Sequence, residues 1–362
     1  MNKKVLVFGK FDIFHPGHKY ILTVAKKLGQ VTVVLESDQA IKKWGHYQPY
    51  HDQNFRKHKL EKLGFRVFVR HLEQGADYII DSLRPDILCL GEDQKLLQKI
   101  FSPFPNINLE IIKFIKSNLY KSSHLTPILE DLTAGVYLID KPKGVNSFRA
   151  VAVIRKVLNM RRVGFSGTLD PLASGLLIVA TGRATRLLDW FHDLPKTYQA
   201  KIVFGKESSS YDLEMPALEN KSAKSFTKKQ LEKVLAGFMG KKIQTTPIYS
   251  AKKVQGEKAY LLARSGQSFK PPIQEIEIYK LKINKFNYPY LSLTATVSAG
   301  TYIRSLAHDL GQAMKTGAVL IDLERMVIGD FKLKKSLALE QINKASLAKY
   351  KIAPATIIER LS

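Results

Sequence analysis

A single carboxylate, Asp170, stands in the glycine-rich stretch Gly164-Phe165-Ser166-Gly167-Thr168-Leu169-Asp170-Pro171-Leu172-Ala173-Ser174-Gly175. The glycines allow backbone conformations that other residues avoid and let a ligand approach closely. Pro171 fixes the backbone beside the acid and disfavours helix at Asp170. An isolated Asp-Pro pair is typical of an ordinary turn, but the apolar run 176–180 predicts a buried strand that anchors this loop. A single acid on a rigid, glycine-rich loop at the edge of a strand is a reasonable place for chemistry.

A second group with chemical potential is a pair of histidines, His15 and His18, in the segment Gly9-Lys10-Phe11-Asp12-Ile13-Phe14-His15-Pro16-Gly17-His18. They open a predicted helix, whose backbone N–H groups favour an anion. Paired imidazoles can stabilise charge on a phosphoryl group, although such a pair is also typical of a helix cap beside a surface histidine. A metal site would need further ligands. Cys89 is the only cysteine, which excludes an intramolecular disulfide and a cysteine-rich metal site.

The elements around the histidines predict an α/β, Rossmann-like domain over residues 1–125. Its strands are predicted at 4–8, 31–35, 67–69, 87–90 and 109–115, and its helices after His18 and at 55–63 and 75–83. Strands that alternate with helices indicate a parallel sheet covered on both faces. Ligands of such sheets bind beyond the carboxyl ends of the strands, where His15 and His18 fall.

The elements around Asp170 predict a different, α+β domain with a mixed sheet over residues 135–330. A strand at 135–140 precedes a helix that Ser147 can cap, and strands near 275–283 and 290–298 can pair as a hairpin. Residues 227–230 form a capping-box pattern. We expect residues 126–134 to be a linker and residues 331–362 to be a short C-terminal extension.

Composition indicates a globular, nucleic-acid-binding protein. The chain has 362 residues, 45% of them hydrophobic, and a net charge of +25. This length predicts two domains, and the basic excess favours a polyanionic partner, nucleic acid ahead of a membrane surface; a generally lysine-rich proteome is the other explanation. Neither a signal peptide nor a membrane-length apolar run is recognisable. We therefore expect a cytoplasmic protein with no membrane association, and a monomer.

The first domain resembles the HxGH cytidylyltransferase-like nucleotidyltransferases, over residues 3–124. Besides the histidine segment, residues 84–94 resemble that family's late strand and nucleotide-binding turn, and residues 120–123 its phosphate-binding motif. The resemblance implies nucleotidyl transfer from a nucleoside triphosphate with Mg²⁺. The nucleotide-binding residues that it implies are Gly9, Lys10, His15, His18, Gly91, Asp93, Lys121, Ser122 and Ser123. Lys10 departs from the usual Thr or Ser, and the acceptor substrate is not readable.

The second domain closely resembles the TruB family of tRNA pseudouridine synthases. Four blocks match in order: 140–144, 167–175, 247–253 and 300–304. The resemblance implies isomerisation of uridine to pseudouridine in the T-arm loop of tRNA, at position 55, without a metal or other cofactor. It makes Asp170 the nucleophile, attacking either C1′ of the sugar or C6 of the ring. Tyr198 would act in acid–base chemistry or stack on the base, and Arg304, if paired with Asp170, would keep it ionised and oriented.

RNA contacts are the remaining implication of this resemblance. Leu323 matches a residue that packs against the target base, and basic side chains would hold the phosphate backbone. The RNA-binding residues that we expect are Lys141, Phe165, Arg183, Lys252, Tyr302 and Leu323. Phe165 stands where the family usually has His, and Asp212 alone survives of a segment that is acidic and Thr-rich in the family.

Three hypotheses about the function of the whole chain follow. The first is a pseudouridine synthase fused to a nucleotidyltransferase-like module. The second is a nucleotidyltransferase that uses a degenerate synthase domain to bind RNA, and the third is an RNA chaperone with both sites idle. The presence together of Asp170, Tyr198 and Arg304 favours the first, because a domain that only binds RNA does not need all three.

Overall fold

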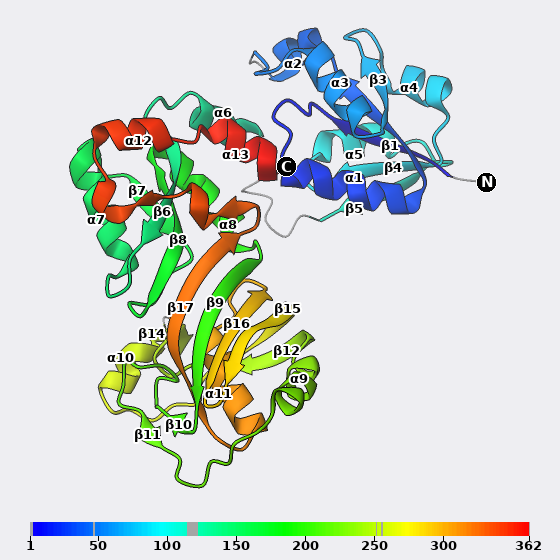
Figure 1. The fold of residues 1–362 in the computed structure, drawn as a ribbon. Helices are drawn as coiled ribbons and strands as arrows, with labels where there is room; N and C mark the ends of the chain where they lie inside the picture. The colour runs from blue at the N-terminus through cyan, green and yellow to red at the C-terminus, as the bar shows by residue number, and fades with distance from the viewer. Residues whose placement is uncertain (1–2, 46–47, 114–121, 251, 255, 362) are drawn as a thin grey trace. The chain divides into compact units, whose positions relative to one another are not determined.

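Two units make up the chain in the computed structural model, which describes residues 3–45, 48–113, 122–250, 252–254 and 256–361. Unit 1 comprises residues 1–134 and 353–362, and unit 2 comprises residues 135–352 (Figure 1). The boundary at residue 134 falls where the predicted linker ends.

Unit 1 contains a five-stranded, all-parallel sheet with the order β3-β2-β1-β4-β5. Both of its faces are covered: Val5 and Val7 of β1 pack into one apolar cluster, and Leu6 and Phe8 pack into another. This alternation follows from the two-residue period of a strand, and it confirms the predicted Rossmann-like architecture. The strands are β1 (Lys4–Gly9), β2 (Gln30–Glu36), β3 (Arg66–Arg70), β4 (Ile87–Gly91) and β5 (Asn108–Ile112).

Helices connect these strands. The α1 helix begins with Pro16, whose fixed φ suits the first helical position, and it buries Ile21, Leu22 and Ala25. Two of the helices, α2 and α5, had no counterpart in the sequence-based prediction. The helices of unit 1 are α1 (Pro16–Leu28), α2 (Asp38–Gly45), α3 (Gln53–Lys62), α4 (Ala76–Leu83), α5 (Lys95–Phe101), α6 (Ser122–Leu129) and α13 (Pro354–Leu361).

The structure differs from the prediction in the linker and in the C-terminal extension. Most of the linker's first half belongs to α6, in which Leu125 and Ile128 are buried. The α13 helix, which buries Ile357 and Ile358, contacts α6 within unit 1. Residues 331–352 instead belong to unit 2. Both departures have the same cause, since apolar side chains distant in the sequence find burial together.

Unit 2 contains a ten-stranded mixed sheet, as predicted, with the main order β12-β15-β16-β9-β17-β8-β6-β19. Within it, β17–β8 and β6–β19 are the parallel pairs, and the predicted hairpin is the antiparallel pair β15–β16. The strands of this sheet are β6 (Gly135–Lys141), β7 (Val163–Ser166), β8 (Ala173–Thr181), β9 (Lys196–Phe204), β12 (Gly240–Thr245), β15 (Ile273–Asn287), β16 (Tyr290–Val297), β17 (Ala318–Ile328), β18 (Phe331–Lys332) and β19 (Leu337–Ala338). Two small hairpins lie outside it: β10 (Lys206–Glu207) with β11 (Leu218–Glu219), and β13 (Lys253–Val254) with β14 (Glu257–Lys258).

The helices of unit 2 cover this sheet. Thr227 and Gln230 form the predicted capping box at the start of α9. Asn146, and not Ser147 as predicted, caps α7, because the side chain of Asn146 accepts from the Arg149 N–H. The α-helices are α7 (Ser147–Leu158), α8 (Leu188–His192), α9 (Lys228–Gly237), α10 (Ala259–Arg264), α11 (Ile303–Ala313) and α12 (Lys344–Tyr350), and the 3₁₀ helices are η2 (Gly182–Leu187), η3 (Leu333–Lys335) and η4 (Leu339–Gln341).

Candidate active site

The loop that carries Asp170 connects β7 to β8 and is held in place by hydrogen bonds from Arg325 of β17. The guanidinium of Arg325 is buried and donates to the carbonyls of Gly167 and Leu176, each at 2.8 Å. Gly175 has φ +102°, and a Cβ there would lie 2.5 Å from the Arg325 carbonyl oxygen. Glycine is therefore required where the loop rejoins the sheet.

A second set of hydrogen bonds fixes the loop on either side of the acid. The Ser147 hydroxyl accepts from the Leu169 N–H and donates to the Leu169 carbonyl, both at 3.0 Å. On the other side, the Gly144 N–H donates to the Pro171 carbonyl at 2.7 Å. The Asp170 carbonyl itself accepts from the Ala173 N–H. The backbone around Asp170 is thus held by Gly144, in the turn between β6 and α7, and by residues of α7, β8 and β17.

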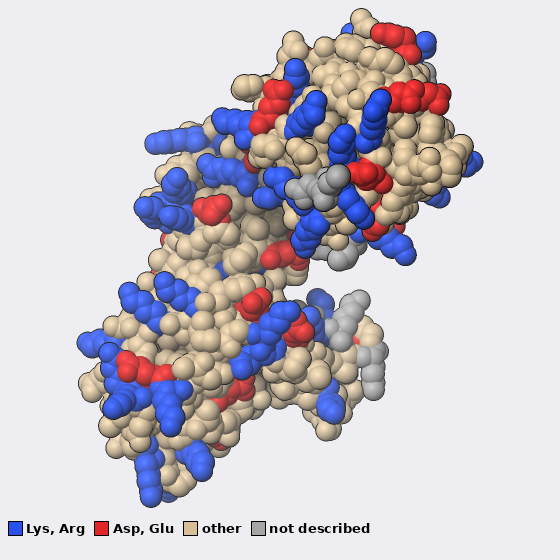
Figure 2. All heavy atoms as spheres, turned by 90° about the vertical axis from the view of Figure 1, so that its right-hand side faces the viewer, with Lys and Arg blue, Asp and Glu red and all other residues tan. Residues whose placement is uncertain are grey.

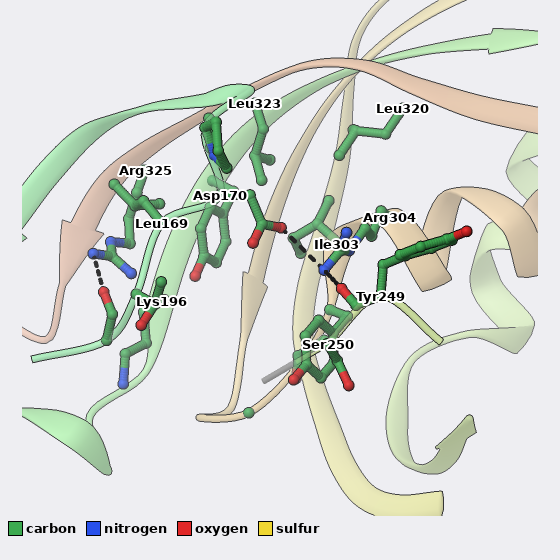
Figure 3. A pocket seen from close by; sticks show the side chains of 18 of the residues that line it. Leu169, Asp170, Lys196, Tyr249, Ser250, Ile303, Arg304, Leu320, Leu323 and Arg325 are labelled. Carbon is green, nitrogen blue, oxygen red and sulfur yellow. Dashed lines mark hydrogen bonds and ion pairs between the residues drawn. The ribbon is translucent and has the colours of Figure 1, made fainter. Parts of the chain in front are cut away.

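Arg304, the second residue of α11, lies between two carboxylates. Its Nη2 is 3.3 Å from Oδ2 of Asp170, and its Nη1 is 3.3 Å from Oδ2 of Asp212. Nη2 also donates to the Tyr249 carbonyl at 2.9 Å. The Arg304 and Asp212 side chains are only 4% and 1% exposed, whereas that of Asp170 is 39% exposed. Asp212 therefore anchors the guanidinium from the buried side, while Asp170 and Arg304 face each other at the pocket (Figure 3).

The electrostatics of Asp170 differ in part from the prediction. The expected pairing with Arg304 is present, and Arg304 lowers the pKa of the carboxyl. Desolvation outweighs this effect, and Asp212 adds to it, so that the pKa of Asp170 is raised above the ordinary value of 3.8. The pairing with Arg304 thus makes the rise in the pKa of Asp170 smaller than burial alone would cause.

Asp212 is a site residue to which the sequence analysis assigned no role. Its segment is ordered by a small hydroxyl network: Ser210 Oγ contacts Ser208 Oγ at 3.1 Å and donates to the Asp212 carbonyl. Oδ1 of Asp212 accepts from the Glu214 N–H at 3.0 Å. The signal in the sequence was the survival of this one acid in an otherwise altered segment.

A cavity of about 440 Å³ surrounds the Asp170–Arg304 pair. Besides that pair, four more of the predicted residues line it: Tyr198, Lys252, Tyr302 and Leu323. Tyr198 is 9% exposed and lies on β9, opposite Arg325 of β17. Burial raises the pKa of the Tyr302 hydroxyl. Lining residues to which the sequence analysis assigned no role include Lys196, Glu214, Tyr249, Ser250, Tyr260, Arg264 and Arg325.

Three predicted RNA-binding residues lie elsewhere. Lys141 is fully buried, and its Nζ donates to the carbonyls of Pro142 and Val145, which does not suit contact with a phosphate. Desolvation lowers the pKa of Lys141 to about 8. Arg183 is exposed on η2, outside the residues that line the cavity. Phe165 is half-buried against the core that α7 covers.

The two histidines of unit 1 meet at the start of α1, as their spacing predicted. Their rings stack with centroids 3.6 Å apart, and His15 Nδ1 accepts from the His18 N–H. Desolvation lowers the pKa of His15 to about 3 and that of His18 well below 6.5. Both imidazoles are therefore neutral near pH 7 and can act as hydrogen-bond donors rather than as cations.

The other nucleotide-site residues group at the carboxyl ends of β1 and β4. Gly9 and Gly91 end these neighbouring parallel strands, and Gln94 joins them by bonding to the Gly91 N–H and the Phe8 carbonyl, each at 2.9 Å. Lys10 and the exposed Asp93 follow the two strands. Lys121 and the side chains of Ser122 and Ser123 lie outside the described residues.

The described residues show no helix long and apolar enough to cross a membrane. Within the same residues, no three His, Cys, Asp or Glu side chains gather as they would around a metal ion.

Unit 2 therefore holds an arginine-paired aspartate in a cavity large enough for a nucleobase. Residues 155–303 match the family described as TruB family pseudouridylate synthase (N terminal domain), and residues 6–123 match the family described as cytidylyltransferase-like. The chain belongs to the TruB family, and unit 2 is a pseudouridine synthase domain.

Curated relatives share this assignment. A protein of Clostridium tetani named tRNA pseudouridine synthase B is 36% identical over 221 residues, which cover 61% of this chain and 76% of the relative. One of the same name from Opitutus terrae is 36% identical over 231 residues, covering 62% and 96%. Among solved structures, a chain of the archaeal box H/ACA sRNP Nop10–Cbf5 complex is 28% identical with a TM-score of 0.43. The match covers 57% of this chain and 51%, about half, of that one.

Proposed function

We propose that this protein isomerises uridine to pseudouridine at position 55, in the T-arm loop of tRNA. The observation that carries the proposal is the placement of Asp170 on a fixed loop, paired with Arg304 in a cavity that Tyr198 also lines. The names of the relatives support tRNA as the substrate.

The reaction is an isomerisation, in which product and substrate have the same composition. The Asp170 carboxylate bonds to either C1′ or C6, the C1′–N1 bond breaks, and the uracil rotates and bonds to C1′ through C5. The bond to Asp170 is broken again as the product forms, which restores the carboxylate. A proton then leaves C5 and a proton is gained at N1. Tyr198 acts in this proton transfer or stacks on the ring. The reaction changes no oxidation state, so it needs no redox cofactor.

Substrate RNA would enter with its target base unstacked, which costs less in a loop than in a paired stem. Tyr302 and Leu323 would contact this base, and Phe165 a neighbouring one, while Lys252 and Arg183 would hold phosphates. The net charge of +25 suits such a partner. Lys and Arg side chains are spread over the face of both units that is seen in Figure 2.

A tritium-release assay tests the proposal. The intact protein should release tritium from tRNA that contains 5-tritiated uridine, and Asp170→Ala should not. Retained tRNA binding by the variant separates loss of chemistry from loss of substrate. Release by Asp170→Ala at the wild-type rate would refute the assignment of the nucleophile. No release by the wild type would favour a degenerate domain that only binds RNA, or a chaperone.

For unit 1 we propose binding of a nucleoside triphosphate. In favour of this proposal, two neutral stacked histidines stand at the start of α1, and Asp12 is buried with no hydrogen bond to its Oδ2 from any described residue. A Mg²⁺ site built by the protein has no such support in the described residues, and we derive no step through this ion. Thermal shift with each of the four triphosphates tests the proposal. At 100 times Kd a ligand stabilises its domain by about 2.7 kcal/mol, and no shift with any of them would refute it.

A further inference from the structure

Phe148, the second residue of α7, is an aromatic side chain that contributes little to the core. It is 69% exposed. Its ring stands edge-on to Phe165 of β7, with centroids 5.4 Å apart and planes at 86°. Phe165 packs in turn against the apolar cluster between α7 and the sheet. The Phe148 ring therefore presents an apolar face to solvent, and Phe165 supports it from the core.

This face lies beside the catalytic loop. Ser147, the residue directly before Phe148, is bonded to both backbone groups of Leu169, and Leu169 directly precedes Asp170. Gly144, in the turn before α7, is bonded to Pro171 on the other side of the acid. The position of Phe148 is thus coupled to that of the nucleophile, although Phe148 is not among the residues that line the cavity.

Two lysines, one in the turn before α7 and one on β9, contact the residue before the cavity-lining Leu323. Lys143 and Lys201 place their Nζ atoms 3.1 and 2.9 Å from the two carboxylate oxygens of Asp322, and their side chains are 51% and 64% exposed. Asp322 directly precedes Leu323, which lines the cavity. One carboxylate thus orients two ammonium groups and leaves a net positive charge, which suits a phosphate of an RNA backbone.

We propose that Phe148, supported by Phe165, is a stacking subsite for an unpaired base of the substrate RNA beside the target uridine. Lys143 and Lys201 hold a phosphate next to it. This inference rests on the proposed action of unit 2 on an RNA loop. A protein segment fits less well, because the apolar face is a single ring pair near oriented ammonium groups rather than a broad patch. Every base has a π-face, so the subsite favours an unstacked loop over a particular sequence.

The test compares Phe148→Leu, which keeps an apolar side chain but lacks the flat ring, with Phe148→Trp, which retains a ring. Tyr290→Ala is the matched control, because Tyr290 is also an exposed aromatic residue, with 59% of its surface exposed. It lies at the start of β16, and the cavity lies near the end of that strand. We expect Phe148→Leu to raise both Kd and KM for a 5-tritiated T-arm stem-loop RNA about 5- to 50-fold. Its kcat and Tm should stay near wild type, as should all values for Phe148→Trp and Tyr290→Ala.

Wild-type Kd and KM in Phe148→Leu would overturn the inference, and a lower Tm with unchanged Kd would do the same by indicating a packing role. If the wild type releases no tritium, the proposed function fails instead. Filter binding of the same RNA then still decides the stacking subsite, because a weakened Kd in Phe148→Leu alone supports it and an unchanged Kd refutes it.

Discussion

Ser147→Ala should impair the enzyme although Ser147 is buried and does not line the cavity. The buried hydroxyl bonds to the N–H and the C=O of Leu169. Without it, both groups of a residue that is 3% exposed lose their partner. A buried polar group left unsatisfied costs about 1–3 kcal/mol. The costs for two groups of one residue do not add in full, so we expect a loss of about 2–4 kcal/mol from the free energy of unfolding of unit 2.

The expected effects can be measured separately. In a unit of this size, 1 kcal/mol changes Tm by about 2–4 °C, so Ser147→Ala should lower Tm by about 4–16 °C. The chain has two tryptophans, and Trp190 is buried in unit 2 whereas Trp44 is 45% exposed in unit 1. Trp190 fluorescence in a Trp44→Phe background therefore reports on unit 2. The single-turnover rate, measured well below Tm, should fall about 10- to 100-fold because a small displacement of the reacting group is costly.

Asn146→Ala is the matched control, since Asn146 precedes Ser147 but only caps α7. Loss of a cap costs about 1 kcal/mol, so its Tm should fall slightly while its single-turnover rate stays at the wild-type value. Equal rates for the two variants, at temperatures where both are folded, would refute the reasoning that Ser147 positions the Asp170 loop.

Four further predictions concern the Asp170–Arg304 site and the predicted RNA contact Phe165. Asp170→Asn should abolish isomerisation and leave tRNA affinity within about fivefold, because an amide keeps the shape without the nucleophilic charge; wild-type-like turnover would contradict this. The rate should fall as the pH is lowered through the raised pKa of Asp170, because protonation removes the nucleophile. The Asp212 carboxylate contributes to the raised pKa of Asp170, so Asp212→Asn should shift the fall in rate at acidic pH to lower pH. The variant should also turn over more slowly, because Arg304 loses its ion pair with Asp212. A pH–rate profile whose acidic side is unchanged would count against this prediction. Phe165→His should remain active and Phe165→Ala should weaken tRNA binding, whereas a lower Tm with unchanged affinity would show that Phe165 only packs the core.

Much of the architecture was predictable because its causes are local. The strands of unit 1 and its helices α1, α3 and α4 follow from hydrophobic periodicity and from the helix start at Pro16. The capping box of α9 follows from four consecutive residues. The order of strands in the sheet of unit 2 was not predictable, because β17 pairs with both β8 and β9 through contacts between distant parts of the chain. Contacts between distant parts of the chain also explain why Asn146, and not Ser147, caps α7. Both side chains can cap a helix, and only the nearby Leu169 backbone engages Ser147 elsewhere.

The sequence by itself determined the candidate reacting groups: an aspartate between glycines and a proline, with a tyrosine and an arginine in separate motifs. These chemical types and their order can be read directly from the chain. Only the tertiary structure decided which charges meet. Asp212 binds Arg304 across 92 residues of sequence, and Lys141 turns inward to its own carbonyls instead of outward to RNA. The physical reason is that a side chain's type fixes what it can bond to, whereas strand register and burial decide which partners come within about 3 Å of it and how strongly its charge is desolvated.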